Sequence, residues 1–478
     1  MNGGSFREFL AEAERAGRLK RVAGPVDPLW EPGCLVKWVF QGLPPAQRFG
    51  LRFDRVGNSP FPLVTGALGA SVDSYAQALG VPPGAINDRW EQALLAPLPP
   101  VVVGAAPCQE VVLTGDDVDL GRLPIPVWTP GRDPAPYLTT CVVNRHADTG
   151  VQNMGVYRTK IRDRRSVIVN LAPGRQGHAC AESDLRQGRP GPIAWVIGAE
   201  PAVYLAAVAN LPMGMDEITV AGALRGAPIP LVKARTSGLL VPANAEIVIE
   251  GEVLPGLLEP EGPFGESAGY MSDVQPRPVA RITAITHRRD AIYCGLASQI
   301  PPSESTTLQG LSNAALIRKL LRHDHGEPTV RDAWIDGMFG GGASHIVISM
   351  TPRRPGHAKE VGRLVARTTS LKRVTVVDED IDVRDREDLD WVMSSHVDPR
   401  RDVEILTGFP AAMDHAVTPD AEGRKLGSKL VVDATRSLDT GPVSLPVPAL
   451  MDRALARWRE AGWPDPDPAR LLRRLGRP

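Results

Sequence analysis

Two glutamates bracket a short turn, and their spacing suits acid–base chemistry. The stretch Glu261-Gly-Pro-Phe-Gly-Glu266 contains a Gly-Pro pair that does not fit a helix, and it lies between segments with strand-like patterns. Such a turn holds two carboxyl groups close together. Neighbouring carboxyl groups tend to have one raised and one lowered pKa, and general acid–base catalysis uses that difference. The stretch therefore predicts a functional carboxylate pair.

A second segment supplies a candidate metal ligand and a cation. Asn153-Met-Gly-Val-Tyr-Arg158 places an amide and a guanidinium five residues apart, just before the strand-like residues 166–170. Arginine binds carboxylates through paired hydrogen bonds, so Arg158 is suited to hold an acid substrate. Spacing alone leaves two structural interpretations open: Asn153 as a turn residue bonded to its own backbone, and Arg158 with Glu261 as a structural ion pair.

Both segments resemble the UbiD-type decarboxylases. The resemblance covers nearly the whole chain in the same order and extends to residues 216–225, 241–251, 284–290 and 377–382. It implies a reversible, non-oxidative decarboxylation of an α,β-unsaturated or (hetero)aromatic acid, with prenylated FMN as the cofactor. It also implies a flavin prenyltransferase as the supplier of that cofactor, and a homodimer.

The resemblance assigns a cofactor site. In this family a divalent metal, Mn²⁺ (or Mg²⁺), holds the flavin phosphate through an Asn, a His and a Glu, with K⁺ nearby. The implied metal ligands are Asn153, His178 and Glu217, and the implied cofactor-binding residues are Asn153, Met154, Arg158, His178 and Glu217. His178 is expected in a loop over residues 173–178. Taken alone, Glu217 fits a solvated acid that leads into a strand.

The resemblance also implies a catalytic set of Arg158, Glu261 and Glu266. In that set Glu261 orients Arg158, and Glu266 accepts and donates the proton. Replacing CO₂ by hydrogen requires a proton donor, and a carboxyl group kept partly neutral by burial can serve as one. Arginine cannot, because its pKa stays above ~12. Phe409 is a candidate for the apolar wall of the substrate pocket, and it also fits an ordinary core position.

Some segments depart from the family pattern. Small residues follow the catalytic turn at 267–272, and residues 299–304 differ from the commoner form, which predicts an atypical pocket. The substrate stays open between aryl or heteroaryl carboxylates and acyclic unsaturated acids. Two rival functions also remain open: a metal-dependent hydrolase with Glu266 as its base, and a non-catalytic flavin-binding subunit of the same fold.

Composition predicts a soluble, cytoplasmic protein that binds neither nucleic acid nor membranes. The 54 Lys and Arg residues balance 55 Asp and Glu residues, so no strong net charge attracts a polyanion. The five cysteines include no Cys-x-x-Cys pair, which argues against a disulfide framework or a zinc site. The start of the chain resembles a capped amphipathic helix instead of a signal peptide.

The pattern of elements predicts a multidomain α/β (α+β) fold with a strand-rich middle, and the resemblance to the UbiD-type decarboxylases implies that this middle part is a split β-barrel that binds the flavin and that the C-terminal domain forms the dimer. We expect an N-terminal α/β region at 1–110, a prenylated-FMN-binding split barrel at 111–304, a linker helix at 305–323 and a C-terminal α/β oligomerisation domain with a helical tail at 324–478. Residues 245–253 alternate apolar and acidic side chains, which predicts a half-buried antiparallel strand. Beyond residue 324 the alternation of strands and helices predicts a parallel sheet.

Overall fold

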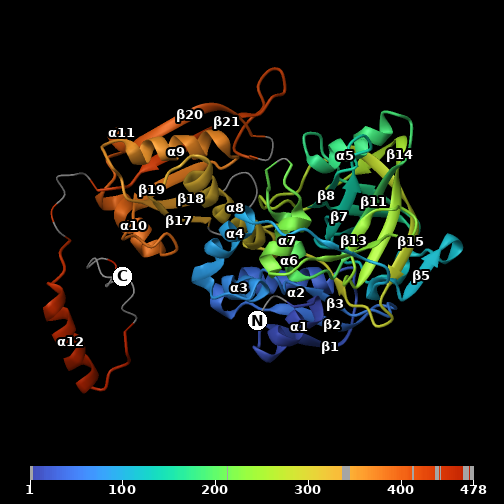
Figure 1. The fold of residues 1–478 in the computed structure, drawn as a ribbon, viewed down its shortest axis with the longest axis horizontal. Coiled ribbons are helices and arrows are strands. Elements are labelled where there is room, and N and C mark those ends of the chain that lie inside the picture. Colours follow the sequence, from blue (N-terminus) through green and yellow to red (C-terminus); the bar gives the residue numbers. More distant parts are fainter. Residues whose placement is uncertain are drawn as a thin grey trace. The chain divides into compact units, whose positions relative to one another are not determined.

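The protein has a mixed α/β fold that divides into two compact units (Figure 1). The computed structural model describes residues 4–212, 214–335, 345–411, 414–436, 441, 443–466 and 473. Unit 1 runs to Leu316 and unit 2 begins at Ile317, so the division falls within helix α8 (Glu304–Lys319). Helix α8 continues into a π-helical turn over Leu320–Asp324.

Unit 1 begins with a small α/β layer. Helix α1 (Phe6–Arg15) starts at the predicted cap, where Ser5 and Glu8 form a reciprocal capping box. A sheet runs in the order β1 (Leu19–Val26), β2 (Gly50–Val56), β3 (Leu63–Thr65) and β16 (Tyr293–Cys294). The helices of this part are α2 (Glu31–Gly42), α3 (Val72–Leu79) and α4 (Ile86–Leu95). Strand β16 thus brings the segment after Cys294 beside the N-terminal layer.

A nine-stranded antiparallel sheet carries most of the candidate site. Its order is β6 (Tyr137–Leu138), β9 (Thr159–Asp163), β10 (Ser166–Val169), β15 (Gln275–His287), β14 (Ile247–Glu261), β11 (Gly191–Ile197), β7 (Cys141–Arg145) and β8 (Gln152–Val156), and β5 (Val111–Thr114) pairs with β15. Strands β8 and β9 lie near opposite ends of this order, yet only Tyr157 and Arg158 separate them in the chain. The sheet must therefore curl until its ends approach each other.

Three helices and a small sheet complete unit 1. Helix α5 (Gln176–Leu185) packs on β7, β8 and β11, while α6 (Pro201–Val208) contacts both α3 and β8. Helix α7 (Glu217–Arg225) contacts α4, α6 and β8, in the middle of the unit in Figure 1. The small sheet has the order β13 (Leu240–Pro242), β12 (Pro230–Lys233), β4 (Val101–Val103). The helices thereby join the N-terminal layer to the edge strand that carries Asn153.

The expectation of a half-buried strand at residues 245–253 is wrong. Strand β14 is antiparallel to both neighbours as predicted, but Glu246 and Glu250 on its acidic side are fully buried. Glu246 pairs with Arg7 at 2.7 Å (Oε1 to Nε), and Glu250 accepts backbone N–H groups from residues 235–237. Buried carboxylates are tolerated where such partners replace water.

Unit 2 contains a five-stranded sheet covered by helices. Its order is β17 (Val330–Ile335), β18 (His345–Met350), β19 (Arg373–Asp378), β21 (Leu426–Asp433) and β20 (Val403–Pro410). The three central strands are parallel, but both edge strands are antiparallel, so the predicted parallel sheet is a mixed one. The helices are α9 (His357–Thr368), α10 (Arg386–Ser395), α11 (Pro399–Asp402) and α12 (Pro448–Glu460). Of the expected helical tail beyond residue 466, only Arg473 lies within the described residues.

All five cysteines are free, and four of them are buried. In the part of the chain that the structure describes, helices long and apolar enough to cross a membrane are absent.

Candidate active site

Arg158 and Glu261 form a buried, doubly hydrogen-bonded pair. Arg158 lies between β8 and β9, and Glu261 is the last residue of β14. The guanidinium Nε donates to Glu261 Oε1 at 2.9 Å and Nη2 donates to Oε2 at 2.8 Å. The Glu261 side chain is 0% exposed and that of Arg158 is 11% exposed. Burial alone would lower the pKa of Arg158, but its carboxylate partners outweigh burial and hold that pKa above its ordinary value.

Glu266 completes the cluster from the other end of the turn. Its Oε1 accepts a short hydrogen bond from Arg158 Nη1. Unlike Glu261, Glu266 keeps a quarter of its side chain exposed (25%). The structure therefore brings together the three residues predicted as a catalytic set, with one carboxylate sealed and the other accessible.

Local geometry fixes the turn that carries these carboxylates. Gly262 has φ +96°, and a Cβ atom there would lie 2.9 Å from the carbonyl oxygen of Asp273, so glycine is required. Ser272 Oγ accepts hydrogen bonds from Arg158 Nη2 and from the Phe264 N–H, both at 3.1 Å. Ser272 was not predicted as a functional residue, and only its place among the small residues that follow the turn hinted at this role.

Asn153 lies in β8, and its amide has a fixed orientation. Its Nδ2 donates to Asn144 Oδ1 at 3.0 Å and to Tyr157 Oη at 3.4 Å. These bonds use the donor side of the amide and leave Oδ1 available as an acceptor. An amide oxygen presented in this way is a suitable ligand for a hard cation.

Glu217 is the first residue of helix α7, not a solvated acid that leads into a strand. Asp216 caps the helix by accepting the Ile218 N–H at 2.8 Å, and Gly226 ends it in a left-handed conformation. Both signals stand in the sequence, and the strand interpretation overlooked them.

The Glu217 carboxylate is buried and short of partners. Its Oε2 accepts the backbone N–H of Met154 at 3.2 Å, next to Asn153. Burial raises the pKa of Glu217 to about 7, and no ion pair to it is found among the described residues. A buried carboxylate that bonds the residue after Asn153 and has no cation from the described residues fits a divalent metal.

His178 lies in the first turn of α5, so the predicted loop ends earlier, at Arg175. Its neighbour Gly177 accepts from Asn144 Nδ2 at 2.7 Å and donates to Tyr157 Oη at 3.1 Å. The backbone before His178 is thereby tied to the surroundings of Asn153. The described residues contain no cluster of three or more His, Cys, Asp or Glu side chains suited to a metal. The predicted ligand set has only two side chains of these types, one His and one Glu, because its third member is an Asn. It would therefore not form such a cluster, and His178 stays a predicted ligand.

Tyr157 organises this region, and the sequence analysis did not single it out. A Cβ atom on Gly155 would lie 2.8 Å from the Tyr157 ring, and one on Gly177 would lie 2.6 Å from it. Both glycines therefore let the ring approach closely, and its hydroxyl oxygen can accept from Asn153 and from the Gly177 N–H. The Gly-x-Tyr spacing within the Asn153–Arg158 segment was the available signal.

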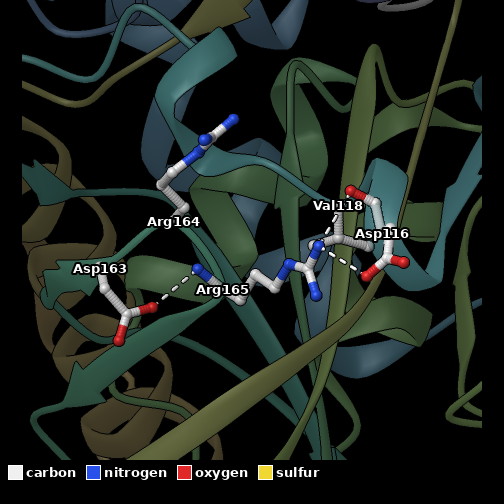
Figure 2. A pocket seen from close by; sticks show the side chains of 5 residues that line it. All are labelled: Asp116, Val118, Asp163, Arg164 and Arg165. Atoms are coloured by element: carbon white, nitrogen blue, oxygen red, sulfur yellow. Dashed lines mark hydrogen bonds and ion pairs between the residues drawn. The ribbon is translucent and has the colours of Figure 1, made fainter.

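Two other features include no residue of this cluster. Phe409, the predicted pocket residue, belongs to β20 of unit 2, where the Lys429 ammonium lies 4.4 Å from its ring centroid; its pocket role stays a prediction. A surface hollow of about 350 Å³ in unit 1 is lined by Asp116, Val118, Asp163, Arg164 and Arg165 (Figure 2). There Arg165 pairs with Asp116 at 3.0 Å, so the hollow's own charges are balanced.

Known proteins resemble this chain over almost its whole length. Three models of the 3-octaprenyl-4-hydroxybenzoate carboxy-lyase (UbiD) family match the chain: the N-terminal domain at residues 10–94, the Rift-related domain at 101–300 and the C-terminal domain at 306–434.

Solved structures of the same class align over almost the full chain. An evolved dimeric form of the UbiD-class enzyme HmfF from Pelotomaculum thermopropionicum, in complex with prFMN, is 33% identical over 95% of this chain and 99% of that chain (TM-score 0.82). The vanillic acid decarboxylase of Sedimentibacter hydroxybenzoicus is 28% identical over 96% and 98% (0.82). The 3,4-dihydroxybenzoic acid decarboxylase of Enterobacter cloacae is 28% identical over 95% and 99% (0.82). The chain belongs to the UbiD family of carboxy-lyases.

Proposed function

We propose that this decarboxylase releases CO₂ reversibly and without net oxidation from an α,β-unsaturated or (hetero)aromatic acid, using prenylated FMN. The observation that carries the proposal is the buried cluster of Arg158, Glu261 and Glu266, in which one arginine faces two unequal carboxylates. The similarity to HmfF in complex with prFMN supports the choice of cofactor. When bound, prenylated FMN supplies the electron-accepting chemistry at the carbon that loses CO₂.

Arg158 binds and orients the substrate carboxylate. Its pKa lies above the ordinary value, so it stays a cation and cannot supply the proton. The two bonds to Glu261 fix the plane of the guanidinium, while Nη1 faces the more accessible Glu266. A substrate carboxylate that competes for Nη1 would thus free Glu266 for proton transfer.

Glu266 donates the proton that replaces CO₂ and accepts it in the reverse reaction. Its partial exposure lets it exchange protons, whereas the sealed Glu261 cannot readily do so. The backbone of Glu266 is held by bonds to Tyr270 O and from the Gly269 N–H, at 2.8 and 2.9 Å. A fixed backbone with an accessible carboxylate suits general acid–base catalysis.

The metal and the phosphate of the cofactor belong at the other cluster. Asn153, Glu217 and His178 would hold Mn²⁺ or Mg²⁺, with K⁺ nearby and with Met154 and Arg158 against the cofactor. The buried Glu217 carboxylate without a cationic partner supports this assignment. The ion would neutralise the carboxylate and link the protein to a phosphate group.

The architecture is proposed to follow the family as well. The curl of the nine-stranded sheet, with β8 and β9 joined by two residues, supports a split barrel for the flavin. We also propose the division of the chain into four parts, and dimerisation through the last of them: 1–110, 111–304, 305–323 and 324–478. Phe409 is proposed as a pocket residue, the cytoplasm as the location, and a flavin prenyltransferase as the supplier of the cofactor. A dimeric form of HmfF supports the dimer.

One preparation tests the proposal. The protein is co-expressed with a flavin prenyltransferase and purified without oxygen, and its absorbance spectrum, cofactor mass and metal content are measured. We expect prenylated FMN and manganese in equal amounts, together with CO₂ release from unsaturated acids. Metal without flavin, combined with hydrolytic turnover, would favour the hydrolase, and bound flavin without turnover on any acid would favour a non-catalytic subunit.

A further inference from the structure

Gln299 has a backbone conformation that side chains rarely adopt. Its φ is +85°, and it is the single non-glycine residue with a positive φ in the part of the chain that the structure describes. A Cβ atom makes this conformation unfavourable, and such residues gather at functional sites, where the surrounding structure holds them in place. The conformation alone does not reveal a role, but it directs attention to the side chain.

The side-chain amide of Gln299 is buried and has no hydrogen-bond partner. The residue is 3% exposed, and neither Oε1 nor Nε2 forms a hydrogen bond within the described residues. Buried amides are nearly always hydrogen-bonded, because losing water without replacement is unfavourable. The amide therefore has one donor group and one acceptor group without a partner among the described residues.

The segment around Gln299 is held firmly, so its position does not reflect a loose loop. Three hydrogen bonds tie the backbone of residues 297, 298 and 300 to side chains of Glu304, Lys37 and Gln41, at 2.8, 2.8 and 3.1 Å. Protein partners thus satisfy the flanking residues on both sides. Only the Gln299 amide among these side chains is left unpaired.

The same side chain lies against the catalytic turn. A Cβ atom built on Gly265 would lie 2.5 Å from Gln299 Cγ and 3.1 Å from its Cδ, so Gln299 fills the space beside Gly265. Gly265 directly precedes Glu266, which bonds to Arg158. The unpaired amide therefore belongs to a side chain that packs against the turn carrying the residue proposed to protonate the substrate.

We propose that Gln299 is a specificity-determining residue that hydrogen-bonds a hydroxyl group on the unsaturated or aromatic frame of the acid. This inference rests on the proposed function, because it takes the substrate to bind beside Glu266. A hydroxyl group both donates and accepts, which matches the open Oε1 and Nε2 of one amide. An acid without a polar substituent would leave the amide unpaired, so the site favours hydroxylated acids over unsubstituted ones.

The test compares the wild-type protein, loaded with cofactor by co-expression with a flavin prenyltransferase, with Gln299→Leu, which keeps the volume and removes the amide. The substrates are matched pairs: cinnamic and 4-hydroxycinnamic acid for kcat/KM, and benzoic and 4-hydroxybenzoic acid for binding by calorimetry. We expect the preference for the hydroxylated member to fall about 10-fold in the variant. The flavin content and the rate with cinnamic acid should stay within about 2-fold, because the amide is not part of the proton transfer.

Gln299→Gly is the second variant, because glycine adopts a positive φ freely and guards against a folding defect of the leucine variant. It should lose the same preference. An unchanged preference in both variants would overturn the proposal, as would loss of flavin from both, which would mean that the amide contacts the cofactor.

If no acid released CO₂ but wild type alone bound 4-hydroxybenzoic acid more tightly than benzoic acid, the proposed function would fail and the Gln299 site would stand. Equal binding of the pair by wild type would refute the Gln299 site.

Discussion

Two clusters in unit 1 differ in whether the chain itself supplies a partner for their buried charge. Around Arg158, the chain itself supplies both the cation and the two carboxylates, which meet through hydrogen bonds. Around Glu217, the chain supplies a buried carboxylate and an amide oxygen, but no cation among the described residues. The first cluster is complete without a ligand, whereas the second lacks its countercharge.

The cluster around Arg158 is therefore preorganised for chemistry, whereas the cluster around Glu217 is suited to bind a ligand. A cluster that brings its own cation and carboxylates together can be positioned during folding and used at once for orientation and proton transfer. A buried carboxylate without a cationic partner makes the empty site unfavourable and therefore makes binding of a cation more favourable. Substitutions in the Arg158 cluster should affect turnover and stability, whereas those at Glu217 should affect loading with metal and cofactor.

The largest effect is expected from Glu266→Gln. This change keeps the shape and removes the proton donor, so CO₂ release should fall by about 10²- to 10⁴-fold while flavin and metal content stay unchanged. Steady-state assays of CO₂ release, with the flavin spectrum as the loading control, would measure it. Turnover near the wild-type level would disprove the role of Glu266.

Glu261→Gln should destabilise the fold. It removes the buried carboxylate that holds Arg158 through two hydrogen bonds and leaves Glu266 to balance the guanidinium charge. We expect a loss of about 3 kcal/mol of unfolding free energy. The matched control is Glu259→Gln on the same strand, whose partner Arg162 is 39% exposed; that change should cost less than about 1 kcal/mol. Equal losses of unfolding free energy for the two variants in denaturant titrations would show that burial of the Arg158–Glu261 pair does not contribute to stability.

Glu217→Gln tests the second cluster, where loading with metal and cofactor should change. We expect manganese affinity to fall by about 10- to 100-fold or more, as seen when metal-site residues are lost, and flavin content to fall with it. The apo protein should be no less stable, since a buried uncompensated charge has been removed. Glu182→Gln, at an exposed pair with Arg186 on α5, serves as the control and should load normally. Normal loading of the Glu217 variant would remove this residue from the metal site.

Glu304 is a third kind of buried carboxylate, held by backbone N–H groups instead of a cation. It accepts from Gly66, Leu68 and Ala297 at 2.9, 3.0 and 2.8 Å, and burial raises its pKa to about 7 from 4.5. The folded state then binds the proton more tightly than the unfolded state, so its contribution to stability falls as pH rises from 4.5 through 7. We expect about 1 kcal/mol of loss between pH 6 and pH 7, relative to Glu304→Gln. Parallel unfolding curves for both proteins across this range would contradict the raised pKa.

Local signals in the sequence predicted much of the fold but not its long-range partners. The capping box at Ser5 and the alternation in β14 gave the correct element types, since both depend on neighbouring residues. Alternation wrongly predicted solvent for Glu246, because its partner Arg7 lies 239 residues away. No local pattern indicates such a pair.

The candidate site shows the same limit. The resemblance placed Arg158, Glu261 and Glu266 in one set, and the structure finds them in contact. Tyr157 was not predicted as a functional residue, and Gln299 entered only as part of the atypical segment 299–304, because their individual roles depend on contacts with Gly177 and Gly265 in other segments. Packing between segments, not residue type, makes these side chains important.

The most direct test of the central claim is decarboxylation in D₂O by the loaded wild-type protein. Glu266 exchanges its proton with solvent, so each CO₂ released should be matched by one deuterium at the carbon that carried the carboxylate. Mass spectrometry of the product and a CO₂ assay on the same sample would measure this ratio. Release of CO₂ without deuterium at that carbon, or turnover by protein that contains metal but no flavin, would contradict the account.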